Sequence, residues 1–276
     1  MGAHLIYQDF LRFLDALGAG TADPWQLYED IYLRPNRAVL EAWWEQCIGR
    51  PRPVWQDRVR SVRPNDYGLL RDLCRDGDLA EIAKGALTRC RSFLPLWLEP
   101  EVYYLVGFFS PEGFVFEVEG RWAIGIGMER LGSLRLVPVL LAHEYGHCYR
   151  RKLGRPRALG QRLVDEGFAV EVSARAFPER PVYEHLLMRP GQLAALREYE
   201  GPLWQAIRPL LGSEDEGLAG RVIYGRGERR EWPSRAGVYL GWQLVHEFLA
   251  AGSSDFGAAA ERVLAARGGP RPCNPT

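Results

Sequence analysis

The segment that most constrains this chain is LLAHEYGHCYR, at residues 140–150, which contains two of the five histidines. Apolar residues recur at helical spacing through this segment, so we expect a helix over 136–152. Four positions separate His143 from His147, which places both imidazoles on one helix face about one turn apart. This spacing lets both rings reach one tetrahedral metal ion, with Glu144 beside them.

The pattern H-E-x-x-H has a specific chemical meaning on a helix. The two histidines bind zinc, the zinc lowers the pKa of a bound water to about 7, and the adjacent Glu accepts a proton from that water. Two histidines in a helix without metal are the alternative, because short motifs also arise by chance. The sequence therefore predicts His143 and His147 as ligands, Glu144 as the general base, and a third ligand elsewhere.

The third ligand is expected on the next helix. Gly154 and Pro156 interrupt the chain after His147, and helical spacing resumes over 159–176. At 1.5 Å per residue, His147 lies roughly 9 Å before the end of its helix and Glu166 lies roughly 12 Å into the next one. An antiparallel pair of helices would set them side by side, so Glu166 is the candidate third ligand of one Zn²⁺ per chain.

The rest of the chain has the patterns of a mostly helical α+β protein with helical N-terminal and C-terminal parts. Three short apolar segments separated by turn signals, at 101–109, 113–120 and 121–128, predict a small antiparallel sheet packed on the helix of the histidines. The further helices are expected over 4–17, 24–48, 67–75, 78–91, 192–211, 235–250 and 255–267. We expect a helical region at 1–95 and a second domain at 96–276, or one continuous domain.

Composition narrows the partners and the location. The 35 basic and 35 acidic residues cancel, which gives no electrostatic reason to expect nucleic acid or a membrane as partner. The five cysteines are scattered without a disulfide framework, which favours a reducing compartment. We see neither a signal peptide nor an apolar run of roughly 20 residues, so we expect a cytoplasmic protein.

HEYGH, a gap of eighteen residues and then EGFA resemble the gluzincin metallopeptidases. The chain length, the strands before LLAHEYGH and the late segment GVYLGWQLVHEF resemble most the small bacterial predicted zinc-dependent proteases, or minigluzincins. The resemblance implies a zincin-like domain, with His143, His147 and Glu166 as zinc ligands and Glu144 as general base. It also implies that the strand 121–128 is the sheet edge that pairs with the substrate backbone.

The resemblance raises two further questions about side chains near the metal. Thermolysin-like gluzincins have an Asp four residues after the ligand Glu, whereas this chain has Val170 there, so Asp165 or Glu171 would have to orient a ligand. Gluzincins also place a Tyr or His from a later segment where it stabilises the oxyanion. Tyr239 is the favoured candidate for this role, with Tyr224 and His246 as alternatives.

The leading interpretation is zinc-dependent hydrolysis of peptide bonds in a peptide or protein substrate. The alternatives are a noncatalytic binding or regulatory protein on the same scaffold, and a hydrolase of a non-peptide amide or ester. Glu144 argues against the noncatalytic protein, because a purely structural zinc site needs no base. Glu129, in the segment GIGMER, is expected at the surface. The alternative is that GIGMER resembles the substrate-reading segment of aminopeptidases, in which case Glu129 would bind the free α-amino group of a substrate.

Overall fold

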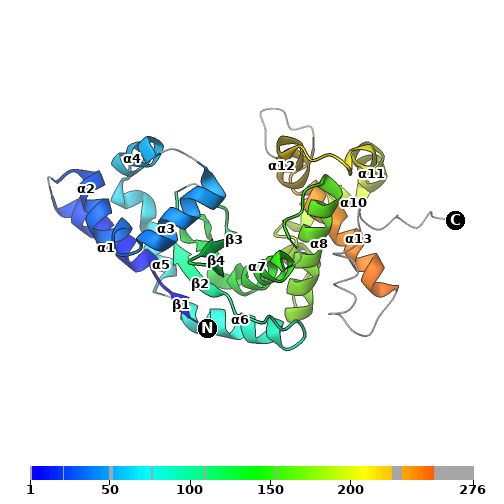
Figure 1. Cartoon of the computed structure of the whole chain (residues 1–276), viewed down its shortest axis with the longest axis horizontal. Coiled ribbons are helices and arrows are strands. Elements are labelled where there is room, and N and C mark those ends of the chain that lie inside the picture. The colour runs from blue at the N-terminus through cyan, green and yellow to red at the C-terminus, as the bar shows by residue number, and fades with distance from the viewer. Residues whose placement is uncertain are drawn as a thin grey trace. The chain divides into compact units, whose positions relative to one another are not determined.

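The computed structural model describes residues 2–20, 22–49, 52–75, 77–108, 110–152, 154–225 and 232–251. These residues form a mostly helical structure with one small four-stranded sheet, which confirms the predicted α+β class (Figure 1). The chain divides into a first unit, Met1–Leu87 with Trp97–Glu144, and a second unit, Thr88–Leu96 with Tyr145–Thr276. The division falls inside two continuous helices, α6 and α7, whereas the boundary expected from the sequence lies near residue 95.

The first unit contains the sheet, in the strand order β1-β2-β4-β3. Its strands are β1 (Ala3–His4), β2 (Glu101–Leu105), β3 (Gly113–Val118) and β4 (Arg121–Gly127). β1 pairs with β2 and β2 with β4 in parallel, and only β3 and β4 are antiparallel. The predicted antiparallel meander is therefore wrong, and so is the assignment of 121–128 to the sheet edge.

The burial of the strands explains this order. β4 is buried on both faces over its second half, as an inner strand must be, and β3 is the edge strand. Glu119 and Gly120 form the two-residue turn between β3 and β4, with φ of 50° and 77°. Two consecutive positive φ values match the twist of a tight antiparallel hairpin, which folds β3 back along the outer side of β4.

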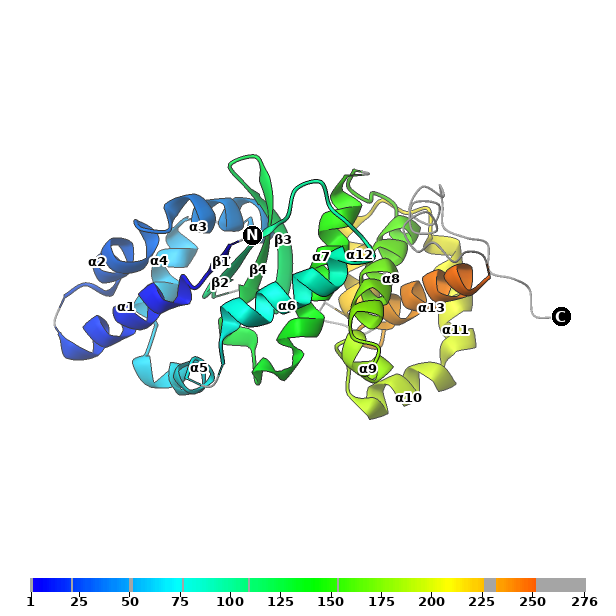
Figure 2. The ribbon, with the colours of Figure 1, turned by 90° about the horizontal axis from the view of Figure 1, so that it is seen from below.

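Alternate residues of β3 face opposite layers of the first unit. Phe114 and Phe116 face the N-terminal helices, where the Trp43 ring stacks on Phe114 with 3.7 Å between centroids. Gly113 faces the opposite way, toward Glu144 of α7. On that second face α6 also lies across the sheet (Figure 2), and the Tyr104 hydroxyl of β2 donates a hydrogen bond to its Leu79 carbonyl.

The helices of the first unit are more broken than the sequence predicted. They are α1 (Tyr7–Ala19), α2 (Pro24–Tyr28), α3 (Arg37–Trp43), α4 (Arg52–Arg60), α5 (Gly68–Leu73) and α6 (Leu79–Arg91), followed by the start of α7 (Val137–Arg151). The expected helix over 24–48 is divided into α2, the π-helical turn η1 (Glu29–Leu33), α3 and a second π-helical turn, η2 (Trp44–Ile48). α4 was not predicted.

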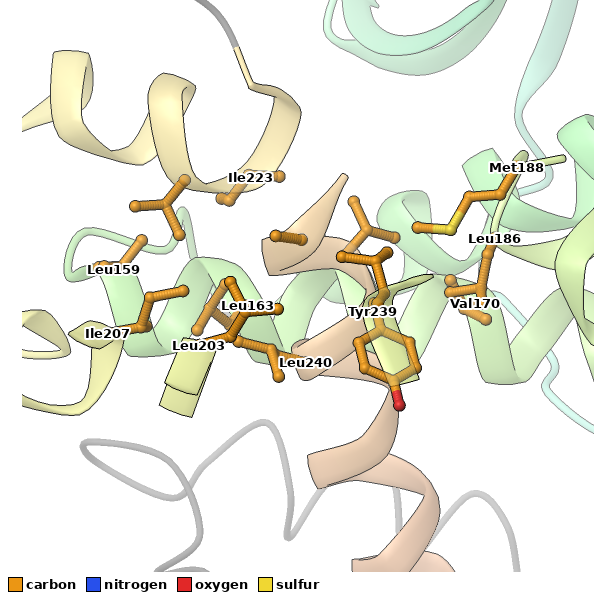
Figure 3. Packing of buried hydrophobic residues seen from close by; sticks show 14 of the residues in the cluster. Leu159, Leu163, Val170, Leu186, Met188, Leu203, Ile207, Ile223, Tyr239 and Leu240 are labelled. Carbon is orange, nitrogen blue, oxygen red and sulfur yellow. The ribbon is translucent and has the colours of Figure 1, made fainter. Parts of the chain in front are cut away.

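The second unit is a helical layer built around α8. Its helices after α7 are α8 (Leu159–Ala176), α9 (Val182–His185), α10 (Pro190–Glu198), α11 (Glu200–Ile207), α12 (Glu216–Tyr224) and α13 (Ala236–Ala250). Leu163 and Val170 of α8 pack with Tyr239 and Leu240 of α13 in its apolar core (Figure 3). The expected helix over 192–211 is divided into α10 and α11, and the expected helix over 255–267 lies outside the described residues.

Glycines set how closely the helices approach in the second unit. A Cβ on Gly146 of α7 would lie 2.8 Å from Ala169 Cα of α8, so these two helices touch through their backbones. Gly167 of α8 faces α13 instead, where an added Cβ would collide with the Gly241 carbonyl. The helices α7 and α8, which carry the candidate ligands, therefore approach closely because position 146 has no side chain.

None of the helices in the described part of the chain combines the length and apolar character needed to cross a membrane.

Candidate metal centre

The helix α7 presents the three residues of the H-E-x-x-H pattern. Pro138 lies in its first turn, where the missing N–H costs nothing, and the flanking apolar residues are buried. His143 and Glu144 are only 4% and 5% exposed. At the C-terminal end, the Arg150 side chain donates a 2.8 Å hydrogen bond to the carbonyl of Gly154, which adopts φ of 89°. Gly154 thus ends the helix and turns the chain toward α8.

The predicted third ligand reaches the two histidines. Glu166 lies on α8, and one ligand atom from each of His143, His147 and Glu166 lies within 4.8 Å of the other two. His147 Nε2 is 3.9 Å from Glu166 Oε1. The short connection between Arg151 of α7 and Leu159 of α8 and the glycine contact at Gly146 allow this approach, in agreement with the residue spacing.

This donor set fits a zinc ion. Two imidazoles and one carboxylate are a common protein donor set for zinc, and they leave a fourth position open. In a tetrahedral site with bonds of about 2.1 Å, ligand atoms lie about 3.4 Å apart, somewhat closer than the 3.9 Å between His147 Nε2 and Glu166 Oε1. The Glu166 side chain is also buried, at 7% exposed for the residue, and a divalent cation would offset the cost of burying its charge.

Asp165 lies where it can orient a ligand. Its Oδ2 is 3.4 Å from His147 Nδ1, the ring nitrogen opposite the one that faces Glu166. Its Oδ1 is 3.7 Å from Arg150 Nε, which balances the buried carboxylate. Glu171 lies apart from this group, because its Oε1 is 2.7 Å from Nδ1 of His246 on α13. Of the two residues considered, Asp165 is the one that the structure places beside a candidate ligand.

Glu144 lies against the edge strand of the sheet. A Cβ on Gly113 of β3 would lie 2.6 Å from Glu144 Oε1 and 2.9 Å from its Cγ. A larger residue at position 113 would therefore displace the Glu144 side chain from its present place. The arrangement puts the candidate base beside the strand whose outer side is available to pair with another chain segment.

The three candidate oxyanion donors have different surroundings. Tyr224, on α12, donates a 2.6 Å hydrogen bond from its hydroxyl to Glu166 Oε1. The favoured candidate, Tyr239, is 1% exposed and belongs to the apolar core of the second unit, where its hydroxyl donates to Glu200 Oε2 at 2.8 Å (Figure 3). Burial first, and then the Glu200 carboxylate, raise the pKa of Tyr239. The structure thus brings Tyr224 to a candidate ligand and gives Tyr239 and His246 other partners.

The sequence indicates Tyr224 as an alternative oxyanion donor, but it does not predict the helix that positions this residue. α12 is EGLAGRVIY, with two glycines that weaken a helical pattern. Its ends nevertheless carry clear signals. The Asp215 side chain accepts hydrogen bonds from the amides of Gly217 and Leu218, and Gly225 ends the helix with φ of 68°. An N-cap residue and a C-terminal glycine with nine residues between them were the signals that identify this helix.

Glu129 is buried instead of lying at the surface as expected. Its Oε1 accepts a 3.1 Å hydrogen bond from the Gly107 amide, and its Oε2 is shielded from solvent without a hydrogen-bond partner among the described residues. Burial is the main reason why the pKa of this carboxyl is raised. The Tyr28 hydroxyl lies near enough that the charge of Glu129, after burial, raises the pKa of Tyr28.

Comparison with known families gives one match. Residues 120–262 match the family described as predicted Zn-dependent protease (DUF2268), a span of just over half of the chain. No curated protein and no solved structure matches the chain significantly. The matched region contains β4, the two helices with the candidate ligands, Tyr224 and α13. The chain therefore belongs to this family of predicted zinc-dependent proteases.

Proposed function

We propose that this protein hydrolyses peptide bonds at a zinc ion held by His143, His147 and Glu166. The observation that carries the proposal is the convergence of these three side chains within 4.8 Å, with Glu144 on the same helix as both histidines. Membership of a family described as predicted Zn-dependent proteases supports it. A zinc ion in this site supplies a Lewis acid and lowers the pKa of a bound water to about 7.

The side chains of this chain would share the remaining work. Glu144 accepts a proton from the attacking water and returns it to the leaving amine. The Tyr224 hydroxyl, which donates to Glu166 Oε1 in the structure, would turn its proton to the oxygen that becomes negative as water attacks. Asp165 Oδ2 lies 3.4 Å from His147 Nδ1, and a hydrogen bond accepted there would fix which nitrogen of that ring faces the metal.

The position of β3 supports a peptide over a small amide or ester as substrate. An edge strand offers main-chain N–H and C=O groups to an extended segment, which adds to the sheet as another strand. Gly113 of β3 is in contact range of Glu144, so a peptide paired there would have its backbone beside the general base. A small ester would gain nothing from this strand.

Zinc reconstitution followed by peptide digestion tests the proposal. The metal-free protein is loaded with zinc, its metal content is measured by elemental analysis, and it is then incubated with a pool of randomised hexapeptides that is analysed by mass spectrometry. We expect one zinc per chain and cleavage that a chelator abolishes. Glu144→Gln should keep the zinc and lose hydrolysis, because it removes a proton acceptor and leaves the three ligands in place.

Glu198→Gln is the matched control, since Glu198 is an exposed carboxylate of α10. It should keep both the metal and the activity. A protein that takes up no zinc contradicts the ligand assignment. A protein that binds zinc and leaves all peptides intact contradicts the catalytic assignment and favours a binding role for the scaffold.

A further inference from the structure

The outer side of the edge strand β3 is occupied at one position by a side chain. The Gln46 amide donates a 2.7 Å hydrogen bond from Nε2 to the Glu117 carbonyl and accepts a 2.9 Å bond at Oε1 from the Glu117 amide. These are the two bonds that a residue of a neighbouring strand would form with Glu117. Gln46 thus imitates one residue of a fifth strand, from a point 71 positions earlier in the chain.

The same two bonds reveal which backbone groups of β3 face outward. In an antiparallel pair, alternate residues direct both their N–H and their C=O toward the partner strand or away from it. Glu117 directs both groups to Gln46, away from β4. With a period of two, Gly113 and Val115 direct theirs to the same outer side. A peptide added to this edge would pair with Gly113 and Val115 and would meet Gln46 at Glu117.

The position of Gln46 is fixed by its neighbours in the sequence. Trp43, at the end of α3, stacks on Phe114 of β3, and Trp44 stacks on Trp55 of α4 with 4.8 Å between ring centroids. Both indoles are buried, whereas Gln46 lies on the exposed side of the π-helical turn η2. The anchored tryptophans therefore hold an exposed amide against the strand edge.

We propose that Gln46 ends the peptide-binding edge of β3 at Glu117 and so limits how far a substrate extends from the site of cleavage. The inference rests on the proposed function. Gly113 lies beside Glu144, and at about 3.4 Å per residue Glu117 lies about 14 Å further along the strand. The edge therefore accommodates about four substrate residues on this side of the cleaved bond, and Gln46 takes the position of the next one.

Peptide extension measures this limit. Each peptide that the zinc-loaded protein cleaves in the hexapeptide pool is extended by Ala-Ser-Ala-Ser at its N-terminus or at its C-terminus. The ratio of kcat/KM for the extended and the original peptide is then compared between the unsubstituted protein and Gln46→Ala. We expect a ratio near 1 at both ends for the unsubstituted protein. In Gln46→Ala, one end alone should show a gain of about tenfold, because two main-chain hydrogen bonds become available to the peptide.

Glu45→Ala is the matched control, because Glu45 is the exposed neighbour of Gln46 in η2. Its ratios should equal those of the unsubstituted protein. Hydrogen exchange of the Glu117 amide gives a second readout that needs no substrate. The exchange rate of this amide should rise in Gln46→Ala and stay unchanged in Glu45→Ala. An unchanged exchange rate would overturn the contact itself.

The possible failures are distinguishable. Hydrolysis with the same length dependence in Gln46→Ala and in the unsubstituted protein overturns the role of Gln46 and leaves the proposed function intact. A gain at both ends also overturns it, because Gln46 closes only one direction along β3. Absence of hydrolysis for every peptide and every variant overturns the proposed function and this inference together.

Discussion

The Tyr224 hydroxyl donates a 2.6 Å hydrogen bond to Glu166 Oε1, the same oxygen that lies 3.9 Å from His147 Nε2. A neutral donor so close to the ligands is well placed to stabilise negative charge that develops during the reaction. Tyr224→Phe should therefore lower kcat by about 10²-fold with little change in KM, as expected for the loss of one oxyanion donor. Steady-state kinetics on one cleaved peptide measures this effect.

Tyr239→Phe is the matched control for Tyr224→Phe. Its hydroxyl bonds to the half-buried Glu200, so its loss should cost about 1 kcal/mol of stability and leave kcat within about twofold. If instead Tyr239→Phe lowers kcat by the larger factor, the role returns to the residue that the sequence analysis favoured.

The second prediction concerns Asp165, which lies 3.4 Å from His147 Nδ1. Asp165→Asn keeps the size of the side chain and removes the charge that orients His147 for metal binding. We expect zinc affinity to fall by about 10- to 100-fold, the usual effect of losing the partner of a ligating histidine. Competition with a chelator of known affinity measures the change.

Glu171→Gln provides the comparison for Asp165→Asn. Glu171 is on the same helix, and its carboxylate contacts His246 instead of a candidate ligand. Zinc affinity should be unchanged in this variant. An equal loss in both variants would mean that the charge of α8 as a whole, and not the contact with His147, supports the metal.

The helices α7 and α8 were the most predictable part of this fold. The expected ranges 136–152 and 159–176 differ from the observed helices by at most one residue at each end. Long apolar periodicity and the break at Gly154 specify such helices locally. The meeting of Glu166 with the histidines followed from helix rise and loop length, because both residues lie on consecutive helices with a short connection.

The sheet order and the position of Tyr224 depend on contacts that local patterns do not encode. The strand segments of β2, β3 and β4 were identified, but nothing in their alternation tells whether β3 or β4 takes the inner position. The choice between Tyr224 and Tyr239 likewise depends on how α12 and α13 pack. Tyr239 faces Glu200 of α11, a partner that is distant in sequence.

The third prediction concerns the contact between α8 and α13. A Cβ on Gly167 would collide with the Gly241 carbonyl, and backbone atoms cannot move aside as a side-chain end can. Gly167→Ala should therefore cost about 2–3 kcal/mol, in the range of overpacked cores. Urea unfolding of the zinc-free protein measures this cost without the contribution of the metal.

Gly220→Ala is the control for the effect of alanine itself. Gly220 lies in α12 with open space where the Cβ would stand, so alanine should stabilise the helix by up to about 1 kcal/mol. A Gly167→Ala protein as stable as the unsubstituted one would contradict the backbone contact between α8 and α13.

The last prediction uses the buried Glu129 as a pH-dependent element of stability. Its pKa is raised above the usual value of about 4.3, chiefly by burial, so the folded protein binds this proton more tightly than the unfolded chain does. The stability that the protonated carboxyl contributes is fully present below about pH 4 and is lost as the pH rises through the folded pKa. Glu129→Gln cannot ionise and keeps an oxygen that accepts from the Gly107 amide. Urea titrations between pH 4 and 8 measure the free energy of unfolding of Glu129→Gln minus that of the unsubstituted protein. This difference should increase with pH above about 4 and level off above the folded pKa.

The exposed Glu45→Gln is the control, and its difference from the unsubstituted protein should not change with pH. A Glu129→Gln difference that is constant or falls with pH would show that the carboxyl is ionised and stabilised in the folded protein.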